Sequence, residues 1–306
     1  MGILKAVLIG DVVGDPGLEV LERVLPLLIK ENSADFVMVN GENAAAGFGL
    51  TGPILERLFA AGTDVVTGGN HIWEKRDFWP ILDSEKRVLR PMNYPAGSPG
   101  RGWVKLEKFS SACGAVIPWL VVNLQGRELM SPLDCPFRTF DALEADLEGK
   151  TAQTDLPPNT EGTQPRSGER KPVILVDFHA ESSREKEALA YYLDGRVSVI
   201  AGTHTHVQTG DERILPNGTA CITDLGMTGC LDGVIGMDTK ICLDRARHQV
   251  LYRMEVAAPS APAAASAPAA ASAPAKAGGK TAVQGIIAEI DADTRKAVSI
   301  RRIPEL

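Results

Sequence analysis

The chain has 306 residues, a formal net charge of −7 and five cysteines. This length is sufficient for one large domain or two smaller ones, each with a well-buried core. The acidic balance and the scattered basic residues argue against a surface that holds long nucleic acid, but they allow a small nucleotide in a pocket. No apolar run is long enough to cross a membrane, and cysteines without a C-x-x-C pair are typical of reduced thiols, so we expect a cytoplasmic protein.

The first third of the sequence predicts strands that alternate with helices. An apolar run over residues 5–10 is typical of a strand buried on both faces, and Asp11 follows it directly. Asp15 and Pro16 then predict the start of a helix that continues to about residue 31, because aspartate caps helices well and proline suits the first turn.

Polar side chains follow two further predicted strands, 36–40 and 64–67, just after their apolar runs. These side chains are Glu42 and Asn43 after the first strand, and Asn70 and His71 after the second. The second half of the chain repeats the pattern. A strand at 173–177 leads to His179, and a strand at 197–201 leads to His204 and His206. Later strands are predicted within 220–229 and at 251–256, 283–290 and 297–303.

We expect a single domain made of residues 1–256 and 283–306. Residues 257–282 are rich in Ala, Pro and Ser, a composition that buries too little apolar surface to fold, so a disordered insertion is predicted. Residues 91–140 contain an alternating pattern and a proline inside an apolar run. These features predict antiparallel strands at a sheet edge, or a small cap over the site.

Eight polar side chains therefore follow strands that are far apart in the sequence. They are Asp11, Glu42, Asn43, Asn70, His71, His179, His204 and His206. They include four of the five histidines. Because open α/β sheets keep their functional groups at the carboxyl ends of strands, we expect these side chains to lie together.

Imidazole and oxygen ligands without cysteine suit a first-row transition metal, with iron or manganese favoured and zinc as an alternative. Eight side chains are more than one ion takes up, so two ions are expected. A carboxylate such as Glu42 can bridge two ions at ~3.5–4 Å, the spacing found in two-metal hydrolases.

The ordered set of motifs resembles the calcineurin-like metallophosphoesterases, and more closely their YmdB-type bacterial subgroup. The resemblance extends from residue 1 to about residue 256 and resumes after the Ala/Pro/Ser tract. It implies an α/β metallophosphoesterase-type sandwich of two packed mixed β-sheets flanked by helices. Two positions depart from the broad superfamily: Val13 stands where the first motif has a histidine, and Glu42 where the second has a bridging aspartate.

The YmdB-type subgroup shares both departures and uses the neighbouring asparagine, here Asn43, in place of the histidine. The resemblance thus implies a first metal held by Asp11, Glu42, Asn43 and His206, and a second held by Glu42, Asn70, His179 and His204. It leaves His71 outside both ligand sets, as a proton donor. The implied reaction is hydrolysis of small phosphodiesters, foremost 2′,3′-cyclic nucleotides, by a hydroxide shared between the metals while His71 protonates the leaving oxygen.

Three other functions remain as alternatives at this point. A regulatory protein that binds nucleotide without turnover would use the same ligands. A nuclease acting on long DNA or RNA would also use them, although the acidic balance of the chain counts against it. A zinc amidohydrolase uses a His-x-His pair too, but normally after its first strand, whereas His204 and His206 come late. Assembly into homo-oligomers is left open by the sequence.

Overall fold

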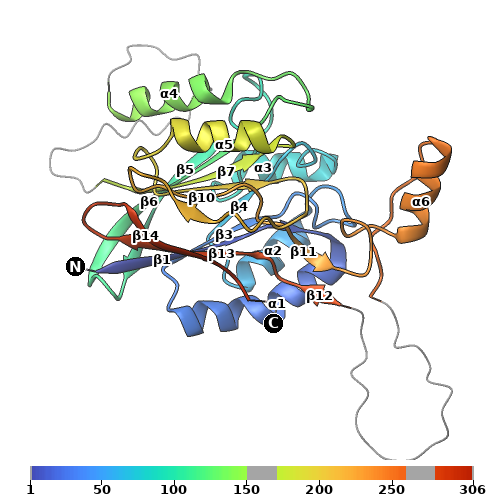
Figure 1. The fold of residues 1–306 in the computed structure, drawn as a ribbon, viewed down its shortest axis with the longest axis horizontal. Coiled ribbons are helices and arrows are strands. Elements are labelled where there is room, and N and C mark those ends of the chain that lie inside the picture. Colours follow the sequence, from blue (N-terminus) through green and yellow to red (C-terminus); the bar gives the residue numbers. More distant parts are fainter. Residues whose placement is uncertain (1, 150–170, 260–279, 305–306) are drawn as a thin grey trace, which may run out of the picture.

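The structure, a computed structural model, describes residues 2–149, 171–259 and 280–304. Two β-sheets pack face to face, and helices cover their outer faces (Figure 1). The first sheet has the order β14 (Ala297–Arg302), β13 (Gly285–Asp291), β1 (Ile3–Ile9), β3 (Phe36–Asn40) and β4 (Val65–Thr67). The second has the order β5 (Trp103–Ser110), β6 (Ala115–Gln125), β7 (Val173–His179), β8 (Val199–Thr203), β10 (Ala220–Ile222) and β9 (Arg213–Ile214).

Both sheets are mixed, as the resemblance implied. β1, β3 and β4 run parallel, β13 pairs antiparallel with β1, and β14 pairs antiparallel with β13. In the second sheet β6, β7, β8 and β10 are parallel, and β5 and β9 close the two edges in the antiparallel sense. A small third sheet was not predicted; it joins β12 (Thr281–Ala282), β11 (Met227–Cys230) and β2 (Asp11–Val12).

Helices α1 (Gly14–Asn32) and α2 (Gly52–Ala60) pack on the outer face of the first sheet. Helices α4 (Pro136–Leu147) and α5 (Ser183–Tyr192) pack on the outer face of the second. A short 3-10 turn, η1 (Arg76–Phe78), and α3 (Trp79–Ser84) follow the loop after β4. The expected α/β architecture is therefore a four-layer one, with helices outside two packed sheets.

Alternate residues of the central strands face the layer between the sheets, because side chains change face with every residue of a strand. In β3, Phe36 and Met38 belong to the core between the sheets, whereas Val37 and Val39 pack against α1 and α2. The ring of Phe36 stacks on Trp119 of β6 with the ring centroids 4.7 Å apart. This contact joins the two sheets through their inner faces.

Residues 91–140 contain the antiparallel strands that were one of the two expectations for them, and the alternative of a small cap stays a prediction. They supply β5 and β6, which pair antiparallel with each other as part of the second sheet, and then α4. Pro118 was expected to mark an edge strand, but β6 lies between β5 and β7. The proline is tolerated because the pairing of β6 with β7 begins only at Trp119, so the missing N–H of Pro118 is not needed there.

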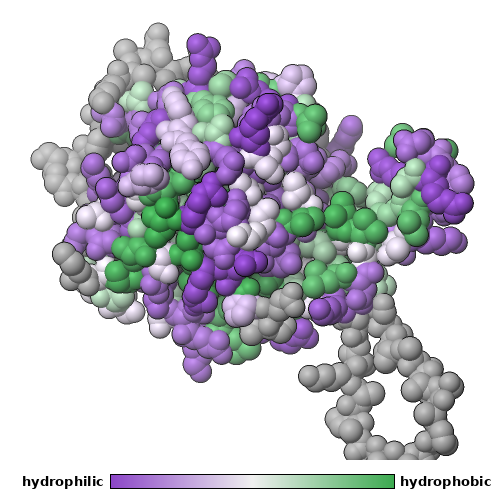
Figure 2. Space-filling view, viewed as in Figure 1, coloured by the Kyte–Doolittle hydropathy of each residue, from purple (hydrophilic) through white to green (hydrophobic). Residues whose placement is uncertain are grey.

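The segment 231–259 also differs from the prediction. The strand expected at 251–256 is absent from the described residues apart from a single bridge between Met237 and Val256. Instead α6 (Thr239–His248) projects from the body, and none of its residues is buried (Figure 1). Figure 2 shows apolar surface where this segment leaves the body, beside the more hydrophilic α6.

Most of the expected Ala/Pro/Ser insertion lies outside the described residues. At its margins Ala257 is buried and Thr281–Ala282 form β12. Disorder of the tract and the single-domain organisation stay predictions. Among the helices that the structure describes, none combines the length and the apolar character that crossing a membrane would require.

Candidate metal centre

The site lies in the layer between the sheets, where the inward faces of the strands change from apolar to polar. Along β7, Val173 and Leu175 belong to the inter-sheet core, while Asp177 and His179 are polar and fully buried. The same change occurs in four other strands, with the inward-facing polar residues Asn40 in β3, Thr67 in β4, Asn123 and Gln125 in β6, and Thr203 in β8. The amide of Asn40 donates to Asp177 at 3.0 Å, so the two sheets meet through these polar ends.

A first group of ligand atoms surrounds the ring nitrogen Nε2 of His179. This nitrogen lies 3.0 Å from Oε1 of Glu42, 3.0 Å from Oδ1 of Asn70 and 3.0 Å from Nδ1 of His204. The ligand atoms of Glu42, His179 and His204 all lie within 4.8 Å of one another. Four of the predicted residues are therefore brought to one point.

A second group surrounds the side-chain amide of Asn43. Its nitrogen lies 3.3 Å from Oδ1 of Asp11, 3.3 Å from Oε1 of Glu42 and 3.2 Å from Nε2 of His206. Rotation of the amide by 180° would place its oxygen at this point instead. The same carboxylate oxygen, Oε1 of Glu42, thus contacts both groups and lies between them.

Three histidines contribute to the two groups: His179, His204 and His206. In each, the outer ring nitrogen, which is the one that points away from the ligand groups, contacts a hydrogen-bond acceptor. The outer nitrogen of His204, Nε2, lies 3.2 Å from Glu181 Oε2, and that of His206, Nδ1, lies 2.9 Å from the carbonyl oxygen of Ile235. The outer nitrogen of His179, Nδ1, lies 2.9 Å from the hydroxyl of Thr203.

The hydroxyl of Thr203 donates its only proton to Asp177 at 2.7 Å, so it must accept from His179 Nδ1. In all three rings the outer nitrogen is therefore the N–H donor. When the ring is neutral, as metal binding requires, the inner nitrogen carries a lone pair that faces the site. This is the arrangement in which histidines bind metals, with a second partner fixing the tautomer.

These residues fit a pair of cations. Inner imidazole lone pairs, carboxylate oxygens and amide oxygens are metal ligands, and here they converge in a place where Asp11, Glu42 and His179 are fully buried. Acceptor atoms packed so closely repel one another unless a positive charge lies among them.

The pKa shifts of these residues in the metal-free protein also indicate a site that favours positive charge. Burial alone would raise the pKa of Glu42, but its interactions with His179 and His71 together outweigh burial and lower that pKa to about 2. Burial likewise acts to lower the pKa of His179, and Glu42 and Asp11 raise it to about 9. Burial and the charge on His179 lower the pKa of His204 to about 3, which keeps this ring neutral. Burial raises the pKa of Asp11, against the opposing effect of His206.

His71 lies beside the two groups rather than within them. Its backbone N–H donates to Oε2 of Glu42 at 3.0 Å, while its ring points elsewhere, with Nδ1 3.3 Å from Glu74. The ring packs edge-on against Phe48 with centroids 5.0 Å apart. Its side chain is 29% exposed and that of His204 is 24% exposed, so the accessible side of the site carries these two histidines.

Sequence reasoning missed the residues that support the ligands. Asp177, Thr203, Asn40 and Thr67 form a buried hydrogen-bonded network behind His179. Their signal is a polar residue two positions before the end of an apolar strand, or at its last inward position. The prediction considered only the residues that follow the strands, so it did not include them.

Comparison with known proteins places the chain in a family. The family model described as YmdB-like protein matches residues 7–271. A "2',3'-cyclic-nucleotide 2'-phosphodiesterase" of Bacillus subtilis (strain 168) is 39% identical over 302 residues, which cover 98% of this chain and 96% of the relative.

Two solved structures agree with this assignment. A hypothetical protein from Thermus thermophilus aligns with a TM-score of 0.75 and 33% identity, covering 98% of both chains. A phosphatase from Mycoplasma pneumoniae aligns with a TM-score of 0.76 and 27% identity, covering 99% of this chain and 93% of the other. The two-sheet fold expected from the motifs is confirmed. The chain belongs to the YmdB-like family of metallophosphoesterases.

Proposed function

We propose that this protein is a phosphodiesterase that uses two metal ions to hydrolyse small phosphodiesters, foremost 2′,3′-cyclic nucleotides. The observation that carries the proposal is the position of Glu42, one carboxylate oxygen of which contacts both groups of ligand atoms. The name of the Bacillus subtilis relative supports the same substrate class.

The geometry supports the following distribution of ligands. One ion would be held by Asp11, Glu42, Asn43 and His206, and the other by Glu42, Asn70, His179 and His204. The mixture of imidazole, carboxylate and amide oxygen without cysteine favours iron or manganese, with zinc as an alternative.

The ions would lower the pKa of a water molecule and draw charge away from the phosphoryl oxygens. The chain supplies the remaining chemistry. We assign His71 as the residue that donates a proton to the leaving oxygen, since an alkoxide leaves poorly without one. Glu74 contacts the ring at Nδ1 and Phe48 packs on it, so both restrict its orientation.

The second candidate is a sensor that binds nucleotide without turnover, which the same ligands would permit. His71 favours the enzyme, because an imidazole that lies outside the ligand groups but is anchored to Glu42 through its backbone suits proton transfer. The cytoplasmic location expected from the cysteines stays a prediction, and so does any homo-oligomer.

The test is hydrolysis by the full chain loaded with manganese or iron. Bis-p-nitrophenyl phosphate reports phosphodiesterase activity, and 2′,3′-cyclic AMP is then compared with single-stranded RNA. We expect turnover of the first two substrates and little of the third. No turnover of any substrate by protein that holds its metals would favour the sensor, and preference for RNA would favour a nuclease.

A further inference from the structure

The loop that carries two of the histidines has an unfavourable backbone. His204 has φ 102° and His206 has φ 64°, in the region where residues other than glycine are uncommon. Such conformations cost of order 1–3 kcal/mol each and persist only where the surroundings hold them. Thr205, between the two histidines, is one point at which the loop is held, and the backbone N–H of His204, which donates to Asp11, is another.

Asp224 holds Thr205 at two atoms. Its Oδ2 accepts from the backbone N–H of Thr205 at 3.2 Å and from the hydroxyl of Thr205 at 2.8 Å. Its other oxygen, Oδ1, accepts from the backbone N–H of Gly226 at 2.8 Å. One oxygen of the carboxylate is thus held by Gly226, and the other oxygen holds the middle of the His204–His206 turn.

Lys186 of α5 neutralises this carboxylate inside the protein. Its Nζ lies 2.7 Å from Oδ2 of Asp224, and the two side chains are only 3% and 2% exposed. A buried ion pair is a poor source of stability, because taking both charges out of water offsets most of their attraction. The three contacts on Oδ2 of Asp224 indicate positioning instead.

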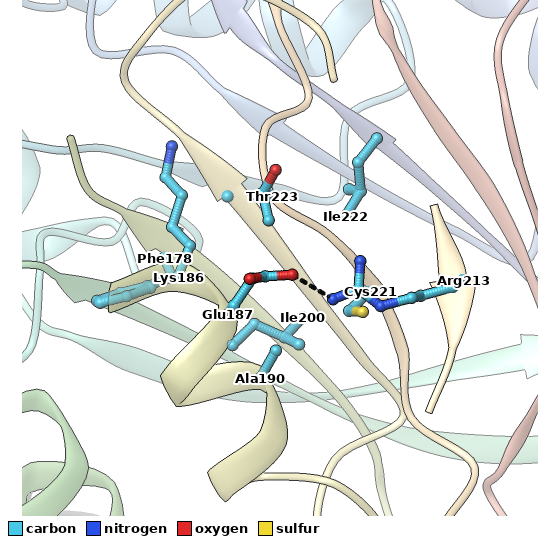
Figure 3. A pocket seen from close by; sticks show the side chains of 10 residues that line it. Phe178, Lys186, Glu187, Ala190, Ile200, Arg213, Cys221, Ile222 and Thr223 are labelled. Atoms are coloured by element: carbon cyan, nitrogen blue, oxygen red, sulfur yellow. Dashed lines mark hydrogen bonds and ion pairs between the residues drawn. The ribbon is translucent and has the colours of Figure 1, made fainter. Parts of the chain in front are cut away.

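The next residue of α5 offers a contrast. Glu187 forms an ion pair of the same length, 2.7 Å, with Arg213, but these side chains are 49% and 31% exposed. Figure 3 shows Glu187 reaching Arg213 across the small pocket, while Lys186 extends away from this pair. Two adjacent residues of α5 thus make ion pairs of equal length. Of these two, only the buried pair of Lys186 and Asp224 contacts the loop of the metal centre.

We propose that Lys186 and Asp224 are positioning residues of the metal centre, which hold Thr205 and so keep the rings of His204 and His206 aimed at the two ligand groups. The inference rests on the proposed function, since it requires metal binding by these histidines. His204 belongs to one ligand group and His206 to the other. Loss of the contacts between Asp224 and Thr205 therefore weakens metal binding at both positions.

The test is a Mn²⁺ titration of the full chain stripped of metal, with free Mn²⁺ followed by electron paramagnetic resonance and the melting temperature measured in parallel. The double variant Lys186→Met/Asp224→Asn removes both charges and the oxygen that accepts from Thr205, while the amide oxygen can still accept from the backbone N–H of Gly226. We expect Mn²⁺ affinity about 10–100-fold weaker at both positions in a variant that still melts above the temperature of the titration. Glu187→Gln, the matched control, should bind Mn²⁺ as the wild type does.

A second pair of variants covers the case in which the double variant does not fold. Thr205→Val removes the hydroxyl and should weaken Mn²⁺ binding, whereas Thr205→Ser keeps the hydroxyl and should restore it. Wild-type affinity in the double variant, or in Thr205→Val if only that protein folds, would overturn the positioning role. Absence of Mn²⁺ binding by the wild type would instead overturn the proposed function itself.

Discussion

The layer between the two sheets has an apolar half and a polar half, built from the same strands. In β7, Val173 and Leu175 pack in the core, while Asp177 and His179 belong to the site. The apolar half is held by burial of hydrocarbon, as where Phe36 stacks on a tryptophan of the opposite sheet.

The polar half is equally buried, but every group in it needs a partner. His179 illustrates the difference, since its outer nitrogen is held by Thr203 and its inner nitrogen faces Glu42. Buried polar groups without partners are costly, so the polar half depends on complete contacts. The site therefore gains rigidity from the apolar core that its strands continue. Substitutions in the two halves should therefore separate stability from chemistry.

The largest effect is expected from Glu42→Ala, in the centre of the polar half. Removing the shared carboxylate takes a ligand from both groups and leaves the buried His179 without its nearest anionic partner. We expect loss of both metals and at least a ~10³-fold fall in kcat/KM, as several kcal/mol of transition-state stabilisation are lost. Elemental analysis and hydrolysis of bis-p-nitrophenyl phosphate would measure both.

His71→Ala should separate chemistry from metal binding. The ring lies outside both ligand groups, so the variant is expected to keep its two metals while kcat falls about 10²–10⁴-fold, the usual contribution of a positioned proton donor. KM should change little. Loss of a metal in this variant would contradict the assignment and return His71 to the ligands.

Trp119→Ala tests the apolar half. The side chain is fully buried between the sheets, and its removal should lower the free energy of unfolding by about 3–5 kcal/mol. The folded fraction should keep wild-type activity. Trp119→Phe is the control: the indole N–H has no hydrogen-bond partner among the described residues, so its loss costs little. Chemical denaturation with activity assays would show whether stability changes alone.

Asp177→Asn should give the smallest effect, and chiefly on metal affinity. Burial raises the pKa of Asp177 to about 6, so in the metal-free protein its ionisation opposes folding as the pH rises above its unfolded pKa. An uncharged amide relieves this cost, but its NH2 group replaces the oxygen that accepts from Asn40 and Thr67, which disturbs the network behind His179. We expect about 10–100-fold weaker metal binding with nearly unchanged stability at pH 7. Unchanged affinity would show that the network behind His179 does not tune it.

Much of this arrangement followed from the sequence because of one regularity: parallel strands that begin in a core end at a common edge. Asp11, Glu42 and His179 come from distant parts of the chain, yet each follows or ends a short buried strand. The positions and directions of the predicted strands were therefore enough to predict that these three residues lie together.

The remainder depended on contacts that local patterns do not contain. The contact between Asp224 and Thr205 depends on the packing of α5. The carbonyl of Ile235 reaches His206 from the segment 231–259, where the strand predicted at 251–256 is absent from the described residues. Pro118 predicted an edge strand, but β6 lies inside the sheet. The proline is tolerated there because the pairing with β7 begins only at the next residue. Tertiary pairing, rather than propensity, set these features.

The most direct test is the metal content of the wild-type chain purified without chelator, measured together with that of Glu42→Ala. We predict two transition-metal ions per wild-type chain and neither in the variant, because one oxygen of Glu42 contacts both ligand groups. One ion or none in the wild type, or two ions retained by Glu42→Ala, would contradict the proposed two-metal centre.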